Sequence, residues 1–125
     1  MPRSLDGVVF APVADQAPGQ VGVSTRFTYH EHEGRVWAEY EGGDVLHGRL
    51  VGTRTGDGLD FRYVQLRVDG TTASGHCVSE IVELPDGRLR LDETWSWESG
   101  PGSGTSTVEE LLVTDTTTIV APSAR

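Results

Sequence analysis

The sequence predicts an all-β protein, an antiparallel up-and-down meander of roughly eight strands closed into a barrel. Turn signals built from Gly with Asp, Glu, Ser or Pro recur at short, regular intervals. The runs between them have strand length and are rich in Val, Leu, Thr, Tyr and Trp. No window shows the apolar period of a helix. Closure is favoured because it removes exposed sheet edges, and an open sandwich is the alternative.

The turns divide the chain into successive strands. Turns are predicted at residues 33–34, 42–43, 56–58, 69–70, 85–87 and 99–104. The strands are therefore expected near residues 21–32, 35–41, 44–54, 59–68, 72–84, 88–98, 105–113 and 116–120. A further short strand is predicted near residues 7–10, followed by a loop over residues 11–20. We expect one domain over residues 1–125, with residues 1–20 irregular and residues 121–125 a frayed tail.

Composition excludes several classes of function. The net charge is −9, which argues against nucleic acid and anionic membrane surfaces as partners. All ten basic side chains are Arg, so Schiff-base and phosphate-loop lysine chemistry are excluded. The absence of Lys and Asn suggests a GC-rich bacterial genome. No stretch has the pattern of a signal peptide or a membrane span, so the cytoplasm is the expected location. The oligomeric state stays open, with a homodimer as one outcome.

The stretch over residues 88–98 alternates strictly between two faces. One face carries Leu89, Leu91, Glu93, Trp95 and Trp97. This face is expected to point into the core, with a carboxylate in its middle. A buried carboxylate must be paired, hydrogen-bonded or protonated, because an unsatisfied buried charge is very costly. The stretch therefore predicts a cavity with a polar lining.

The other strands contribute polar and aromatic residues to the same interior. Alternation predicts inward positions for Tyr29, Tyr40, Tyr63, Gln65, Cys77 and Ser79. Such a set is typical of the walls of a ligand pocket, and we expect these residues and the two tryptophans to contact a ligand. The small residues Gly48, Ala38 and Gly75 are expected to leave room inside. The alternative is a filled core in which the polar groups satisfy one another.

Glu93 and Glu110 form the candidate catalytic pair, with the Tyr63 hydroxyl as a group that could polarise a substrate. The two carboxylates lie on successive predicted strands with matching inward faces. Two carboxyls held close together in a low dielectric raise one pKa, which suits a general acid or base. The alternative is that Glu110 faces water, which a register shift of one residue would produce.

His30 and His32 are the candidate metal ligands, because two His residues at i and i+2 of a strand share a face. Both lie next to the turn at Gly34, which favours a solvated strand end, and we expect neither metal nor cofactor. A third ligand would have to come from His47, His76 or Glu39.

Cys77 is the only cysteine, which excludes an intramolecular disulfide and a zinc ribbon. A nucleophilic thiolate would need an activating His. His76 is adjacent in sequence and therefore points to the opposite face of its strand. We expect Cys77 to be a small buried apolar residue.

A set of short motifs lies between residues 27 and 111. They are VWAEYEGG at residues 36–43, Gly48-x-Leu50, Arg62-Tyr63, Gly75-x-Cys77-x-Ser79, LPDGRLRL at residues 84–91, Glu93-x-Trp95-x-Trp97-x-Ser99-Gly100 and Glu109-Glu110. These motifs resemble a family of small bacterial β-rich proteins that often carry the label N-acetylglutamate synthase. The resemblance implies the meander and its inward Tyr, Cys, Ser, Glu and Trp positions. The architecture also resembles the calycin group of lipocalin-like and avidin-like barrels.

Three functions are consistent with these features. The first is a barrel that binds a small, largely apolar or aromatic molecule in an internal cavity. The second is a cofactor-free cyclase, isomerase or dehydratase that uses Glu93 as general acid or base. The third is a non-catalytic interaction module whose core is filled.

Overall fold

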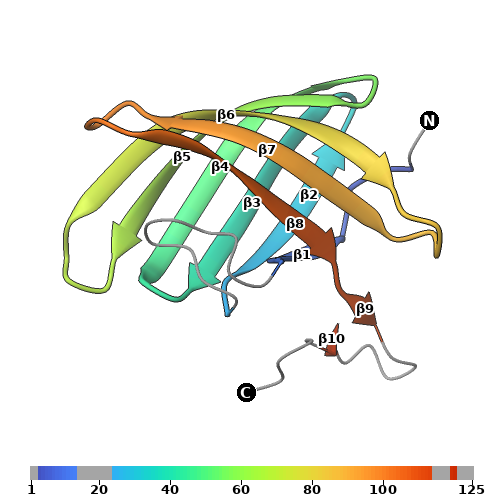
Figure 1. Cartoon of the computed structure of the whole chain (residues 1–125), viewed down its shortest axis with the longest axis horizontal. Helices are drawn as coiled ribbons and strands as arrows, with labels where there is room; N and C mark the ends of the chain where they lie inside the picture. Colours follow the sequence, from blue (N-terminus) through green and yellow to red (C-terminus); the bar gives the residue numbers. More distant parts are fainter. Residues whose placement is uncertain (1–2, 14–23, 114–118, 121–125) are drawn as a thin grey trace.

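A computed structural model describes residues 3–13, 24–113 and 119–120. Eight antiparallel strands, each bonded to the next in chain order, form a closed barrel (Figure 1). The predicted all-β meander is confirmed, and the sandwich alternative is wrong. In the described part of the chain, no helix has the length and apolar character needed to cross a membrane. The barrel strands are β1 (Val9–Pro12), β2 (Arg26–His32), β3 (Arg35–Gly42), β4 (Val45–Thr55), β5 (Gly58–Arg67), β6 (Thr72–Glu83), β7 (Leu89–Trp97) and β8 (Ser103–Glu110).

Strand β1 closes the barrel by pairing with β2 on one side and β8 on the other. The predicted strand near residues 116–120 was expected in the barrel. Its last two residues, Ile119 and Val120, do form a strand, but outside the barrel, and residues 116–118 lie outside the described residues. Strand β9 (Leu112–Val113) and strand β10 (Ile119–Val120) form a separate two-stranded sheet. The predicted strand over residues 105–113 is therefore two strands, because the chain leaves the barrel after Glu110.

The N-terminal strand also differs from its predicted bounds. It includes Ala11 and Pro12, which were expected in a loop. Proline fits at the end of a strand because no donor is required there, and the amide of Val13 bonds to Thr107 O at 3.0 Å. The rest of the predicted loop, residues 14–20, lies outside the described residues, as does the predicted tail over residues 121–125.

The face of β4 was ambiguous in the sequence, and the structure explains why. The register shifts between Tyr40 and Gly42 and between Val45 and His47. This irregularity breaks the alternation of side chains. Val45 and Leu50 are both buried, although they lie five positions apart and alternation would place them on opposite faces. The exposed Val64 on β5 has a different origin, because the register there is continuous and the residue simply faces outward.

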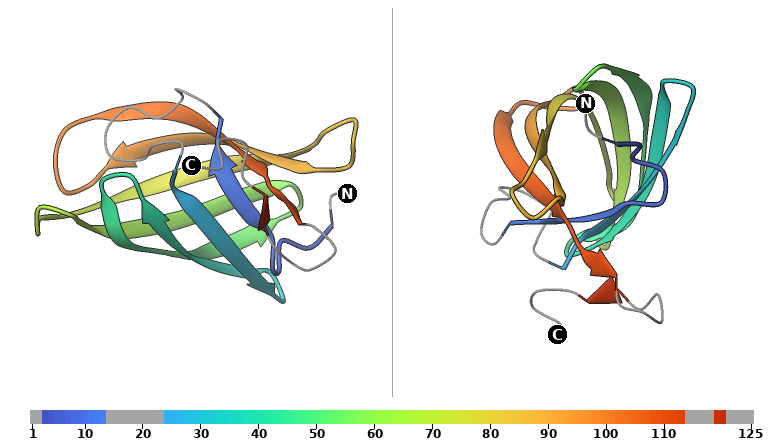
Figure 2. Two further views of the ribbon diagram at one scale, coloured as in Figure 1. Left: turned by 90° about the horizontal axis from the view of Figure 1, so that it is seen from below. Right: turned by 90° about the vertical axis from the view of Figure 1, so that its right-hand side faces the viewer.

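The N-terminal segment closes one end of the barrel. Leu5 is fully buried, and the view down the barrel in Figure 2 shows this segment crossing the near end. Glu31 holds it in place, because its Oε1 accepts hydrogen bonds from Leu5 N and from Arg54 Nη1, both at 2.9 Å. The Arg54–Glu31 ion pair is largely buried. A hydrogen-bonded, buried ion pair at this position fixes the segment over the barrel end.

Aromatic rings cover glycines on neighbouring strands. Tyr40 lies opposite Gly48, and Tyr63 lies opposite Gly75. A Cβ atom at either glycine would overlap the facing tyrosine ring. The prediction that Gly48 and Gly75 leave room inside the barrel is therefore wrong. The space above each glycine is filled by a ring, and the glycine allows that ring to lie against the sheet.

Substitution of Gly48 tests this packing. We expect Gly48→Ala to destabilise the barrel by about 1–3 kcal/mol, because the new methyl group forces Tyr40 out of its place. Gly100→Ala is the matched control, since a Cβ at Gly100 meets nothing within 4 Å. Urea unfolding of both variants measures the effect. Equal free energies of unfolding for the two variants would contradict the packing described here.

Candidate functional site

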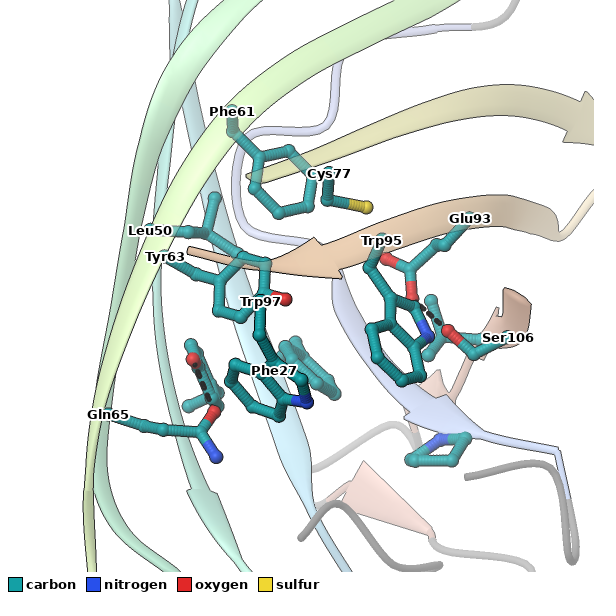
Figure 3. A pocket seen from close by; sticks show the side chains of 13 residues that line it. Phe27, Leu50, Phe61, Tyr63, Gln65, Cys77, Glu93, Trp95, Trp97 and Ser106 are labelled. Atoms are coloured by element: carbon teal, nitrogen blue, oxygen red, sulfur yellow. Dashed lines mark hydrogen bonds between the residues drawn. The ribbon is translucent and has the colours of Figure 1, made fainter. Parts of the chain in front are cut away.

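A pocket with a volume of about 80 Å³ occupies the interior of the barrel (Figure 3). The pocket lies near the C-terminal ends of strands β3, β5 and β7. The N-terminal segment closes the opposite end of the barrel, which is called the plugged end below. A single water molecule needs roughly 10–15 Å³ of such space, so the pocket has room for several water molecules or for part of a small organic molecule. Its walls come from Pro12, Phe27, Tyr40, Leu50, Phe61, Tyr63, Gln65, Cys77, Glu93, Trp95, Trp97, Ser106 and Val108.

Aromatic rings meet at steep angles along one wall of the pocket. The ring centroids of Trp95 and Trp97 are 5.9 Å apart, with an interplanar angle of 61°. Tyr63 meets Trp97 at 5.6 Å and 66°. On another part of the wall, Phe27 and Tyr40 stack at 4.8 Å. Edge-on neighbours fix one another's orientation, and their faces therefore remain turned in several directions around the pocket.

The tyrosine hydroxyls of the pocket are held by hydrogen bonds. Tyr40 Oη donates to Gln65 Oε1 at 2.9 Å, and Tyr63 Oη donates to the backbone oxygen of Ser96 at 3.2 Å. Burial is the main cause that raises the pKa of both tyrosines well above the usual value. Both hydroxyls therefore stay protonated at neutral pH. Gln65 is buried, and its side chain is oriented by Tyr40.

Glu93 lies in the middle of β7 and turns its carboxyl into the pocket (Figure 3). The β7–β8 register places Ser106 opposite it. Ser106 Oγ donates a hydrogen bond to Glu93 Oε1 at 2.9 Å. Burial raises the pKa of Glu93 from 4.5 to about 7, and the charge of Asp92 adds to this, whereas the Ser106 hydrogen bond opposes it. The carboxyl therefore changes charge near neutral pH.

Glu110 does not join Glu93, and the predicted carboxylate pair is wrong. The β7–β8 hairpin pairs Ser96 with Ser103, so position 106 lies opposite Glu93 and Glu110 is four residues further along β8. There its Oε1 accepts hydrogen bonds from Leu89 N at 3.0 Å and from Arg3. Glu110 thus anchors the N-terminal segment and does not line the pocket. The expected general acid or base has a serine as its neighbour in place of a second carboxylate.

Two other residues expected to bind ligand do not line the pocket. Tyr29 is fully buried and packs edge-on against Phe10, with centroids 5.3 Å apart. Its hydroxyl has no hydrogen-bond partner among the described residues. Ser79 is also buried, opposite Glu93 on β6, and its Oγ lies 3.6 Å from Cys77 Sγ. Neither residue is among those that line the pocket.

Cys77 lines the pocket as a buried thiol. Burial is the main cause that raises its pKa, and the charge of Glu93 raises it further. The thiol is therefore protonated at neutral pH and is not an activated nucleophile. His76 bonds through Nε2 to Asp60 Oδ1 at 2.6 Å. As predicted, alternation along β6 keeps this imidazole on the face opposite Cys77.

The histidines of β2 make local contacts at the barrel surface. His30 bonds to Glu39 at 2.7 Å and stacks against Trp37 at 5.5 Å. The imidazole of His32 lies 3.7 Å from the carboxylate of Glu33, and both side chains are exposed. Within residues 3–13, 24–113 and 119–120, no group of three His, Cys, Asp or Glu side chains is placed to hold a metal ion.

Several pocket residues were not predicted as site residues. Phe27 and Phe61 are apolar and are typical of an ordinary core, although alternation places them inward, and Leu50 lies on the strand whose face the sequence left ambiguous. Alternation places Ser106 on the same face as Glu110, but only the hairpin register shows that Ser106 lies opposite Glu93. Pro12 carries no signal in the sequence, because its segment reads as a loop until β1 closes the barrel.

Comparison with family models places this barrel among known proteins. The model described as avidin-like protein matches residues 3–111. The chain belongs to the avidin-like protein family. The matched residues span all eight barrel strands of this avidin-like protein. A search of curated proteins and a search of solved structures each found no match. The family and the closed barrel both fit a small-molecule-binding barrel.

The raised pKa of Glu93 predicts a pH-dependent stability. The folded protein holds this proton up to about pH 7, whereas the unfolded chain releases it near 4.5. The stabilisation is complete below the unfolded value and is lost as the pH rises through the folded value. The advantage of Glu93→Gln over the wild type should therefore grow by about 2 kcal/mol between about pH 5 and about pH 8.

Urea unfolding of the wild type and Glu93→Gln across this pH range measures the difference. Glu83→Gln is the control, because this substitution removes the same charge at an exposed position, the last residue of β6. A difference between wild type and Glu93→Gln that does not change with pH would show that Glu93 titrates normally.

Proposed function

We propose that this avidin-like barrel binds a small, largely apolar or aromatic molecule in its interior. The observation that carries the proposal is the pocket itself, whose lining joins six aromatic rings and one carboxyl. A core that served only for stability would be filled with aliphatic side chains. Here the aliphatic residues gather toward the plugged end, and the aromatic and polar ones gather around the pocket.

The side chains divide into contact surfaces and orienting groups. Trp95, Trp97 and Tyr63 offer large rigid surfaces, whose angles are set by their mutual contacts. Gln65 and Glu93 place polar groups in the lining of the pocket from β5 and β7, two strands that are separated by β6 alone. Few polar groups on an apolar wall are typical of ligand sites, because the wall supplies affinity and the polar groups supply orientation. The pocket is largely formed before a ligand arrives, which reduces the entropic cost of binding.

A second function is favoured by one observation, the pKa of Glu93 near 7. A general acid or base works best when its pKa lies near the working pH. In this alternative, the protein is a cofactor-free cyclase, isomerase or dehydratase, and Glu93 moves a proton within a site that excludes water. The hydroxyl of Tyr63 is a donor, but it is already bonded to Ser96 O. The alternative therefore depends on Glu93 more than on Tyr63.

Removal of an inner ring tests the binding function. We expect Trp97→Ala to weaken the binding of indole and of benzyl alcohol by at least about tenfold, because the variant loses a wall of the pocket. Trp37→Ala is the matched control, since Trp37 lies on the outer face of β3 and is 40% exposed. Titration followed by the indole N–H signals in NMR spectra gives both affinities. Absence of binding to the wild type, or equal losses in both variants, would overturn the proposal.

The enzyme alternative is separated from binding by Glu93→Gln. This variant keeps the shape of the side chain but cannot transfer a proton. If the protein is a catalyst, the variant should retain affinity for an uncharged substrate and lose turnover by at least about a hundredfold. Incubation of the wild type and the variant with candidate substrates, followed by product analysis, makes the comparison. Product formed at equal rates by both proteins would exclude Glu93 as the acid or base.

A further inference from the structure

The lining of the pocket contains a carboxyl group but no positively charged side chain among the described residues. Glu93 is the acidic residue of its lining, and none of the described residues that line it is Arg, Lys or His. Ser106 Oγ gives the carboxyl a neutral hydrogen bond, which does not cancel its charge. Buried carboxylates are usually paired with a cation, because an isolated charge in a low dielectric is costly. The ionised carboxylate of Glu93 therefore has no positively charged partner among the described lining residues.

The neighbouring titratable groups do not supply the missing charge. The groups packed around Glu93 from β2, β3, β5 and β6 are neutral at neutral pH, because burial raises the pKa of each; they are Tyr29, Tyr40, Tyr63 and Cys77. The preceding residue on β7, Asp92, adds negative charge. Its Oδ1 forms an ion pair with Arg90 Nε on the outer face at 2.9 Å. The electrostatic environment of the pocket is therefore negative once Glu93 is ionised.

The aromatic rings of the pocket also favour a cationic ligand. The faces of Trp and Tyr rings carry negative quadrupole charge and attract cations, with Trp the strongest. Trp95, Trp97 and Tyr63 stand at angles of 61° and 66° to one another, so they form the sides of a corner rather than a flat stack. Rings arranged in this way can contact one cationic group from several sides.

We propose that the ligand of this pocket is a small organic cation, a substituted ammonium group carried on an apolar or aromatic body. The proposal rests on the binding function inferred above and names its ligand class. Glu93 is the counter-ion, and the rings of Trp95, Trp97 and Tyr63 surround the cationic group. Glu93 is partly buried, and a bound cation favours its ionised carboxylate, so binding lowers the cost of the charge there.

Other ligand charges fit less well. An anion would meet Glu93 and the negative faces of the rings, in a protein of net charge −9. An uncharged ligand could accept a hydrogen bond from protonated Glu93, but it would leave the carboxylate uncompensated at higher pH. The two cases have opposite pH dependence, because a cation needs the ionised form of Glu93 and a neutral acceptor needs the protonated form.

A set of matched probes tests the ligand class. Benzylammonium, benzyl alcohol and benzoate share one ring and differ in charge. Affinities are measured by NMR titration of the indole N–H signals, with Trp37 as an internal reference outside the pocket. We expect benzylammonium to bind at least about tenfold more tightly than benzyl alcohol at about pH 8, and benzoate to bind most weakly.

The pH dependence and one variant identify the group responsible. With a pKa of about 7 for Glu93, benzylammonium affinity should fall about tenfold from about pH 8 to about pH 6. The probe stays cationic over this range. Glu93→Gln should lower benzylammonium affinity by at least about tenfold and change benzyl alcohol affinity by less than about threefold. Glu83→Gln, which removes an exposed charge on β6, should change neither affinity.

The outcomes distinguish failure of the proposed ligand class from failure of the proposed binding function. A preference for the cation that disappears in Glu93→Gln supports the ligand class. If benzyl alcohol binds at least as well as benzylammonium, or if the preference survives in Glu93→Gln, the ligand class is wrong and the binding function stands. If none of the probes shifts the signals of Trp95 and Trp97, both the ligand class and the binding function are overturned.

Discussion

The closed hydrogen-bond register of the barrel is the constraint on which the rest of the structure depends. Side chains alternate along each strand, so a slip of one residue would turn every inward group outward. Closure removes this freedom, because all eight strands must agree around the ring. Strand β1 completes the ring by pairing with both β2 and β8. The positions of Glu93, Ser106 and the pocket rings are all consequences of that agreement.

The interior of the barrel has a packed end and an end that holds the pocket. At one end, the N-terminal segment covers a core that includes the buried aliphatic residues Leu59, Ile81, Leu89 and Leu91. The buried Arg54–Glu31 pair fixes that segment in place. At the other end, rings pack over glycines and against one another, which holds them in orientation without filling the space between them.

Under the proposed binding function, Glu93 would exchange stability for function. Burial raises its pKa, so the ionised carboxylate costs stability. An apolar side chain of similar size would pack there at no such cost. A ligand that stabilises the charge would restore the lost free energy on binding. Groups that destabilise the unliganded fold in this way are typical of binding and catalytic sites.

The sequence by itself determined the fold class, the positions of most strands and the faces of β2, β3, β5, β6 and β7. These features depend on local alternation and turn residues, which are visible in any short window. Alternation was sufficient to place Glu93, Trp95 and Trp97 on the inward face of β7.

Only the tertiary structure decided which side chains meet. Glu110 was separated from Glu93 because the hairpin register, which depends on the turn, pairs Glu93 with Ser106. The barrel closed through the N-terminal strand and not through residues 116–120, because closure depends on contacts between residues about a hundred positions apart. The glycines expected to leave space were covered by tyrosine rings from neighbouring strands. Local patterns define the face of each strand, whereas register, closure and packing depend on the whole ring at once.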